Sequence, residues 1–205
     1  MTHNDDREKV LAAFGGKKGL LDSGIPSILF LIVFNVRHDL HDALYASIAT
    51  SLVLTIIRLA KRDTVQHALS GLFGVLFCAW LANRTGNPSD VFVPKLLINL
   101  LYGSVYLIAN LAGWPVLGLM LGPILGENLN WRKVPARKAV YLRAGWLWIG
   151  LFFSRIIVQY PIYKSGNVNL LGTVNLAMGT PLFIATGYGT WMILKTVPAA
   201  KLEVN

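Results

Sequence analysis

The sequence contains little cysteine and little charge, and each shortage excludes a class of protein. A single cysteine, Cys78, among 205 residues excludes a disulfide-stapled domain and a zinc ribbon. Only 14% of the residues are charged and 54% are hydrophobic, whereas about a quarter of the residues in a soluble domain are charged. The mean hydropathy is +0.53. The chain is therefore neither disordered nor an ordinary soluble domain, and we expect a membrane protein.

Six apolar segments are long enough to cross a bilayer as helices. They cover residues 20–36, 42–60, 66–82, 93–113, 140–162 and 170–194. A further apolar stretch at 114–126 would extend only about 18 Å as a helix, against about 30 Å of hydrocarbon. We therefore expect an all-α polytopic bundle of six transmembrane helices, with a re-entrant or interfacial hairpin at 114–126.

Acidic residues are few, and the distribution of the basic ones predicts the topology. The chain has 19 Lys and Arg against 10 Asp and Glu. With six spans and an inner N-terminus, 13 of the 16 Lys and Arg in loops lie on the cytoplasmic side, as membrane proteins prefer. A seventh crossing at 114–126 would remove this bias. We expect both termini in the cytoplasm, a tail at 1–18 with a possible amphipathic helix, a six-helix domain at 19–196 and a tail at 197–205.

Charged side chains inside a span are costly and usually face the bundle interior or a wet cavity, so they are functional candidates. Arg155 lies about 22 Å into the fifth span. In one interpretation it belongs to a polar pocket, open to the outside, that binds an anionic solute or a lipid headgroup. The lining residues would be Lys95, Asn99, Arg155, Gln159 and Asn175.

The other interpretation gives Arg155 a structural role. It would pair with Asp90 or Asp42, or with backbone carbonyls freed by Pro161 or Pro181, and would fix the packing of the bundle. The sequence leaves both interpretations open.

A second pair of charges lies near the inner surface. Asp22 opens the first span and Arg143 opens the fifth. They are expected to form a salt bridge between helix ends or, alternatively, to act in gating or coupling, with Asp22 carrying a proton.

Glycine and proline mark two special segments. Gly118, Gly122 and Gly126 are spaced four apart, which predicts a small-residue packing face or, alternatively, a gate made from re-entrant backbone. Gly179 with Pro181 predicts a bend in the sixth helix.

Motifs of catalysis and of metal binding are missing or weak. The sequence has no Walker loop, GxSxG elbow, HExxH motif, CxxC pair or GxGxxG after a strand, so an enzyme is not expected. His38, His41 and Asp42 form only a weak metal-binding pattern, because no further ligand is apparent. We expect no metal site and no cofactor.

Several short motifs are spread over about residues 11–194. They consist of Gly15, Gly16, Asp22, Pro26, Arg84, Thr85, Gly86, Asn99, Tyr102, Trp114, Pro115, Gly118, Gly122, Gly126, Trp131, Arg132, Trp148, Arg155, Gln159, Tyr163, Gly179 and Pro181. Together they resemble the motifs of the actinobacterial DUF3159 family of uncharacterised integral membrane proteins. This resemblance implies a multi-pass protein of the bacterial plasma membrane.

A looser similarity connects the chain with the intracellular septation protein A family. It rests on the proline-containing first span, on Gly86, Asn87 and Pro88, and on Pro94 with Lys95. This likeness implies a role in envelope integrity or cell division.

Two functional hypotheses follow. The first is a small transporter or channel-like protein, with a homo-oligomer as a possible assembly. The second is a non-transporting scaffold of the envelope or of cell division. In both, the basic loops suit anionic lipids of the cytoplasmic leaflet rather than nucleic acid.

Overall fold

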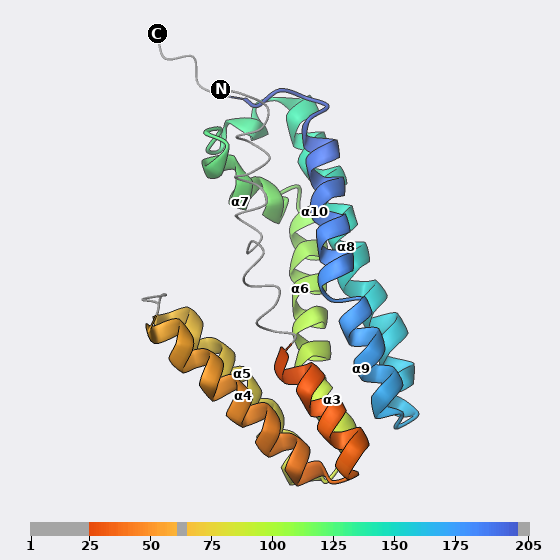
Figure 1. The fold of residues 1–205 in the computed structure, drawn as a ribbon. Coiled ribbons are helices and arrows are strands. Elements are labelled where there is room, and N and C mark those ends of the chain that lie inside the picture. Colours follow the sequence, from red (N-terminus) through yellow and green to blue (C-terminus); the bar gives the residue numbers. More distant parts are fainter. Residues whose placement is uncertain (1–24, 61–64, 201–205) are drawn as a thin grey trace. The chain divides into compact units, whose positions relative to one another are not determined.

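The computed structural model describes residues 25–60 and 65–200 of the chain, and all regular elements in that part are helices (Figure 1). The predicted all-α class is therefore confirmed. The elements are α3 (Ile25–Arg37), α4 (Leu40–Ala60), α5 (Val65–Thr85), the 3-10 helix η1 (Pro88–Phe92), α6 (Val93–Leu111), α7 (Val116–Ile124), the 3-10 helix η2 (Asn130–Arg132), α8 (Pro135–Lys164), α9 (Val168–Ala177) and α10 (Thr180–Leu194).

Four segments of the described chain are long and apolar enough to cross a membrane. They are Leu40–Ile57, Pro88–Leu111, Pro135–Lys164 and Val168–Leu194. The other two predicted spans correspond to α3, which has 13 residues, and to α5, which has 21. Six crossings remain a prediction, as do the tails at 1–18 and 197–205. Residues 1–24 and 201–205 lie outside the described part of the chain.

The described chain divides into two compact units, and each has its own hydrophobic core. Unit 1 comprises residues 98–157 and 178–200, and unit 2 comprises residues 25–60, 65–97 and 158–177. The long helices α6 and α8 contribute to both units.

Aromatic side chains fill the core of unit 1. The rings of Tyr106 and Trp148 stack with centroids 5.9 Å apart, and Phe183 meets Trp148 edge-on at 5.1 Å. The indole Nε1 of Trp148 donates to the Thr190 hydroxyl over 2.9 Å. Because a buried indole N–H needs an acceptor, this bond fixes α10 against α8 within the unit.

Unit 2 is built on α3 and α4, which a tight turn joins at His38. His38 has a φ of 52°, and Asp39 Oδ1 then accepts the backbone N–H of Asp42 over 2.9 Å and caps the start of α4. The short helix α9 packs against α3, since a Cβ at Gly172 would overlap the side chain of Leu31.

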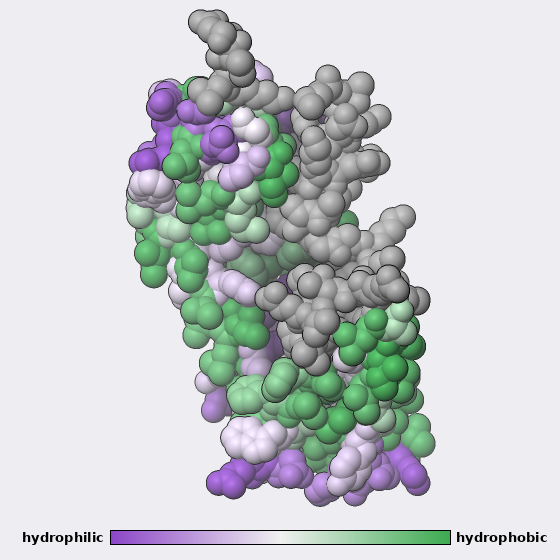
Figure 2. All heavy atoms as spheres, turned by 90° about the vertical axis from the view of Figure 1, so that its left-hand side faces the viewer, coloured by the Kyte–Doolittle hydropathy of each residue, from purple (hydrophilic) through white to green (hydrophobic). Residues whose placement is uncertain are grey.

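Many apolar side chains remain exposed on the outer faces of the helices. Ile56, Phe73, Phe77 and Ile108 are between 53% and 70% exposed. Figure 2 shows hydrophobic residues along the helix sides of one face and hydrophilic residues near helix ends. This distribution suits helices that face hydrocarbon.

Candidate functional site

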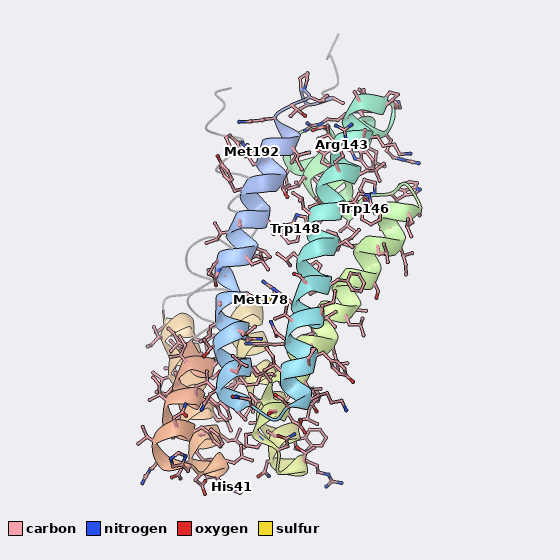
Figure 3. The ribbon with its side chains drawn as sticks, turned by 90° about the vertical axis from the view of Figure 1, so that its right-hand side faces the viewer. His41, Arg143, Trp146, Trp148, Met178 and Met192 are labelled. Carbon is pink, nitrogen blue, oxygen red and sulfur yellow. The ribbon has the colours of Figure 1, made fainter. Side chains whose placement is uncertain are left out.

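Arg155 of α8 binds the backbone where the chain passes from α9 to α10. Its Nε donates to the carbonyl of Met178 and its Nη2 to the carbonyl of Gly179, each over 2.8 Å. Figure 3 labels Met178 at this junction. Of the partners that the structural interpretation offered, helix carbonyls are therefore the ones that Arg155 contacts.

The two carbonyls are accessible because the helix is broken at Gly179. The sequence predicts a bend there, and the structure has a complete interruption between Ala177 and Thr180. Pro181 has no N–H to bond to the carbonyl of Ala177, so the ladder cannot continue across the break. The Arg155 guanidinium supplies the Met178 carbonyl with a donor, and it shares the Gly179 carbonyl with the backbone N–H of Phe183, which lies 3.1 Å away.

Asn99 of α6 completes the surroundings of Arg155 in unit 1. Its Oδ1 lies 3.4 Å from Arg155 Nη1, and Asn99 is only 8% exposed. In the described part of the chain, Nη1 and Nη2 therefore each keep one N–H without an acceptor.

The described acidic residues all bind other groups, so none neutralises Arg155. Asp42 pairs with Arg37, and Asp90 accepts from Tyr163 Oη over 2.8 Å. Glu127 pairs with Arg137, and Asp39 caps α4. The charge of Arg155 is thus uncompensated by any described carboxylate.

The remaining predicted residues cluster in unit 2. Lys95 Nζ lies 3.3 Å from Ser27 Oγ and 3.3 Å from Asn175 Oδ1. Asn175 Nδ2 in turn donates to Gln159 Oε1 over 3.1 Å, and Gln159 is 1% exposed. Both Lys95 contacts are longer than a usual charge-assisted bond of 2.7–2.9 Å.

The five residues predicted to line one pocket thus form two separate groups of contacts. Arg155 with Asn99 belongs to unit 1, while Lys95, Gln159 and Asn175 belong to unit 2.

The predicted inner pair is described only in part. Arg143 is exposed on α8 (Figure 3), and Asp22 lies outside the described residues. A salt bridge or a gating role for this pair remains a prediction.

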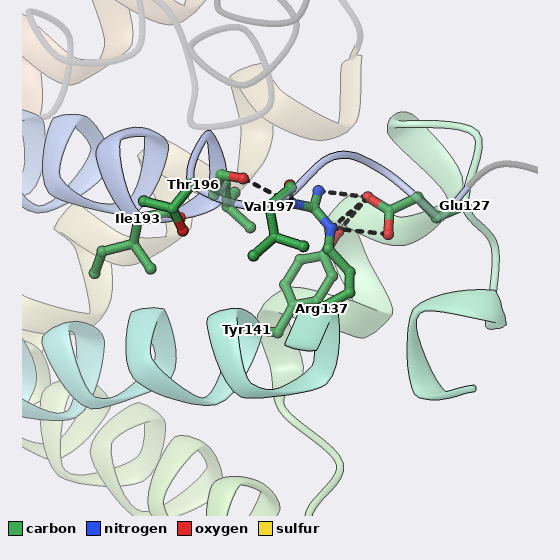
Figure 4. A network of polar contacts seen from close by, with 7 residues as sticks. Glu127, Arg137, Tyr141, Ile193, Thr196 and Val197 are labelled. Atoms are coloured by element: carbon green, nitrogen blue, oxygen red, sulfur yellow. Dashed lines mark hydrogen bonds and ion pairs between the residues drawn. The ribbon is translucent and has the colours of Figure 1, made fainter. Parts of the chain in front are cut away.

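The best-formed polar cluster of unit 1 is a buried ion pair that the sequence reasoning did not single out (Figure 4). Arg137 Nε donates to both carboxylate oxygens of Glu127 over 3.0 and 3.1 Å, and Tyr141 Oη donates to Oε1 over 3.0 Å. Glu127 is 0% and Arg137 2% exposed. Arg137 is one of the 13 cations that the predicted topology places in cytoplasmic loops, but it lies in the first turn of α8 and is buried.

Arg137 also fixes the end of α10. Its Nη1 donates to the carbonyls of Leu194 and Val197 over 2.7 and 2.6 Å. The Leu194 carbonyl is one of the terminal carbonyls of α10 that no helical N–H satisfies, and Val197 follows in the chain after the helix. A signal for this cluster exists in the sequence, because Glu127 is the only acidic residue between Asp90 and Glu203.

The predicted small-residue face of 114–126 packs on one indole ring. A Cβ at Gly118 would approach the ring of Trp131 to 2.8 Å, and one at Gly122 to 3.1 Å. Gly126 instead forms a turn with a φ of 73°. Gly118 and Gly122 therefore allow α7 to pack closely on Trp131. The helix α7 itself has nine residues, a length expected of a helix that does not span the membrane.

The residues of the weak metal pattern take part in local contacts. Arg37 Nε lies 3.2 Å from Asp42 Oδ2, and both side chains are well exposed. The backbone N–H of Asp42 lowers the pKa of the Asp39 carboxyl. Within the described residues no group of three or more His, Cys, Asp or Glu could hold a metal.

Comparison with known families identifies the chain. The model of DUF3159, described as a protein of unknown function, matches residues 14–201. The chain belongs to the DUF3159 family. No curated protein and no solved structure matched this DUF3159 protein. Its helices are those of an integral membrane protein, and the family supplies no activity.

Proposed function

We propose that this DUF3159 protein is a small transporter or channel-like protein of the plasma membrane, in which Arg155 binds an anionic solute or a lipid headgroup. The observation that carries the proposal is an embedded guanidinium held by two carbonyls of a broken helix without a described carboxylate. Broken helices with exposed backbone groups form binding sites in many transporters.

Backbone carbonyls accept hydrogen bonds from Arg155 but do not neutralise its charge. The carbonyls of Met178 and Gly179 accept two of the N–H groups of Arg155, but they are neutral and leave its full positive charge. A charged residue at the centre of a membrane helix costs about 2.5–3.5 kcal/mol even on the most permissive scale. An anion that uses the two remaining N–H groups would offset part of this cost.

Arg155 lies well inside the apolar part of α8. It is nine residues from the end of the helix at Lys164, which corresponds to about 14 Å. The side chain therefore cannot simply reach the water beyond the end of the helix.

One observation favours the alternative, a non-transporting scaffold of the envelope or of cell division. Arg155 joins α8 to the α9–α10 junction by two short bonds, and such bonds also stabilise a helix bundle without any ligand. The two functions differ in whether an anion stabilises the protein through Arg155.

Thermal unfolding in detergent tests for anion binding. Unfolding midpoints would be measured with inorganic phosphate, sulfate, chloride and short-chain phosphatidylglycerol. An anion at about 100 times its Kd stabilises the folded state by about 2.7 kcal/mol. We expect at least one probe to raise the midpoint of the wild type and to have no effect on Arg155→Gln, with partial rescue in Arg155→Lys.

The matched control is Arg84→Gln, which removes a cation from the exposed end of α5. It should keep the anion response. If Arg155→Gln folds and responds to the probes as the wild type does, Arg155 does not bind an anion and the scaffold becomes the better hypothesis.

We further propose six crossings with both termini in the cytoplasm, since the charge distribution favours this topology. The two ends of α8 test it in a Cys78→Ala background. Cysteines at Lys133 and Ser165, both exposed, flank a helix about 45 Å long. An impermeant thiol reagent outside the cell should label Ser165→Cys and spare Lys133→Cys. The reverse pattern, or labelling of both, contradicts this topology.

A further inference from the structure

One end of unit 1 gathers basic residues from three segments. Arg137 bonds to the carbonyls of Leu194 and Val197, so the start of α8 lies against the end of α10 (Figure 4). The preceding helix η2 ends at Arg132, close to the start of α8, and Lys195 follows directly after α10. These segments therefore present their cations at the same end.

Two of these cations, Arg132 and Lys195, lie over tryptophan rings. A third cation at this end, Lys138, lies beside the residue that precedes Trp114. The Arg132 guanidinium carbon is 3.4 Å from the centroid of Trp114, and Lys195 Nζ is 4.6 Å from that of Trp191. Lys138 Nζ would lie 3.2 Å from a Cβ at Gly113, the residue before Trp114. Tryptophans and long basic side chains together are typical of the interface between lipid tails and water.

Among the described residues, the exposed charge at this end of unit 1 is positive. In the described part of unit 1, Glu127 is the only acidic residue, and it is fully buried against Arg137. The cations left at or near the surface are Arg132, Lys133, Lys138, Arg143 and Lys195.

Apolar side chains are exposed beside these cations. On α7, Leu119, Met120 and Ile124 are 40–44% exposed, and Leu129 in the following turn is 52% exposed. A surface that combines exposed apolar residues with cations fits a membrane interface, where tails cover the apolar part and headgroups meet the charges.

We propose that this end of unit 1 binds the headgroups of anionic phospholipids. The phosphates contact Arg132, Lys138 and Lys195, and the acyl chains cover the exposed residues of α7. A zwitterionic lipid binds less well because its choline would meet the same cations. The inference does not depend on the proposed anion site at Arg155.

Native mass spectrometry of the purified full chain tests this inference. The protein would be offered equal amounts of phosphatidylglycerol and phosphatidylcholine with matched chains. We expect the wild type to retain more phosphatidylglycerol than phosphatidylcholine. Arg132→Gln and Lys195→Gln should each lower the ratio of bound phosphatidylglycerol to bound phosphatidylcholine about fivefold, since each cation near an anionic surface contributes about 1 kcal/mol. The preference should weaken as the ammonium acetate concentration rises.

Lys164→Gln is the matched control. Lys164 Nζ lies 5.9 Å from the ring of Tyr160 at the other end of α8, so this variant also removes a cation beside an aromatic ring. It should keep the lipid ratio, as should the charge-conserving Arg132→Lys.

Two results overturn the proposal. One is an unchanged ratio in Arg132→Gln and Lys195→Gln, which would mean that these cations only pack on their tryptophans. The other is an equal loss in Lys164→Gln, which would mean that any surface cation attracts the lipid. Lys138→Gln, at a half-buried position, replaces Arg132→Gln if that variant does not fold.

Discussion

Replacing Arg137 by methionine is expected to destabilise the folded protein by about 3–5 kcal/mol, because it leaves a buried carboxylate without its cation. Glu127 is 0% exposed, and Tyr141 would be its one remaining hydrogen-bond donor among the described residues. The substitution also removes the donor that satisfies the carbonyls of Leu194 and Val197. These losses act on the same end of unit 1.

A double-mutant cycle separates the ion pair from the other contacts. Glu127→Gln alone leaves the Arg137 charge buried, and it should also be strongly destabilising. Combining Glu127→Gln with Arg137→Met removes both charges, so the double variant should cost less than the sum of the single ones. We expect a coupling free energy of about 2–3 kcal/mol, at the upper end of the range for residues in contact.

The assay is unfolding by SDS in mixed micelles, followed by tryptophan fluorescence. Trp131 is a suitable reporter because its ring lies 5.4 Å from that of Tyr141. Tyr141→Phe provides a smaller step, a loss of about 1.5 kcal/mol for one hydrogen bond to a charged group. A loss below about 1 kcal/mol in Arg137→Met, with additive single variants, would refute the buried pair.

Two further predictions concern packing in unit 1. Gly122→Ala should lower the free energy of unfolding in SDS by about 1–3 kcal/mol, because its Cβ would overlap the Asn128 carbonyl. Gly150→Ala is the control, since a Cβ there meets nothing within 4 Å. Equal losses of stability in the two variants would contradict close packing at Gly122. Trp148→Phe and Thr190→Val should each lower the free energy of unfolding by about 0.6–1.7 kcal/mol. Their effects should not add, since both remove the same hydrogen bond between Trp148 and Thr190. Strictly additive losses would show that this hydrogen bond contributes nothing.

The sequence predicts the helices well because their signals are local. Apolar length placed the ends of α4, α5 and α6 within about three residues, but it missed the start of α8. That helix begins at Pro135 rather than near Val140, because the basic residues of its first turn reduce the apolar signal. Gly179 and Pro181 likewise marked the break before α10, since proline cannot continue a helical ladder.

The contacts of the site were harder to predict because they depend on which helices become neighbours. Arg155 stood out as an embedded cation, but the sequence could not choose between an acid and the backbone as its partner. Arg137 was misplaced among the loop charges because a charge count assumes that loop cations are solvated. Its partner Glu127 is ten residues away, a spacing that no local motif captures.

Anion flux through liposomes containing the purified protein tests the central claim most directly. Vesicles would be loaded in turn with chloride, phosphate and sulfate, and release would be followed for the wild type, Arg155→Gln, Arg84→Gln and protein-free vesicles. We predict that at least one anion leaves faster through the wild type and Arg84→Gln than through Arg155→Gln, by about tenfold or more, which corresponds to about 1.4 kcal/mol. Equal release from all four preparations for every anion would contradict a transport function based on Arg155.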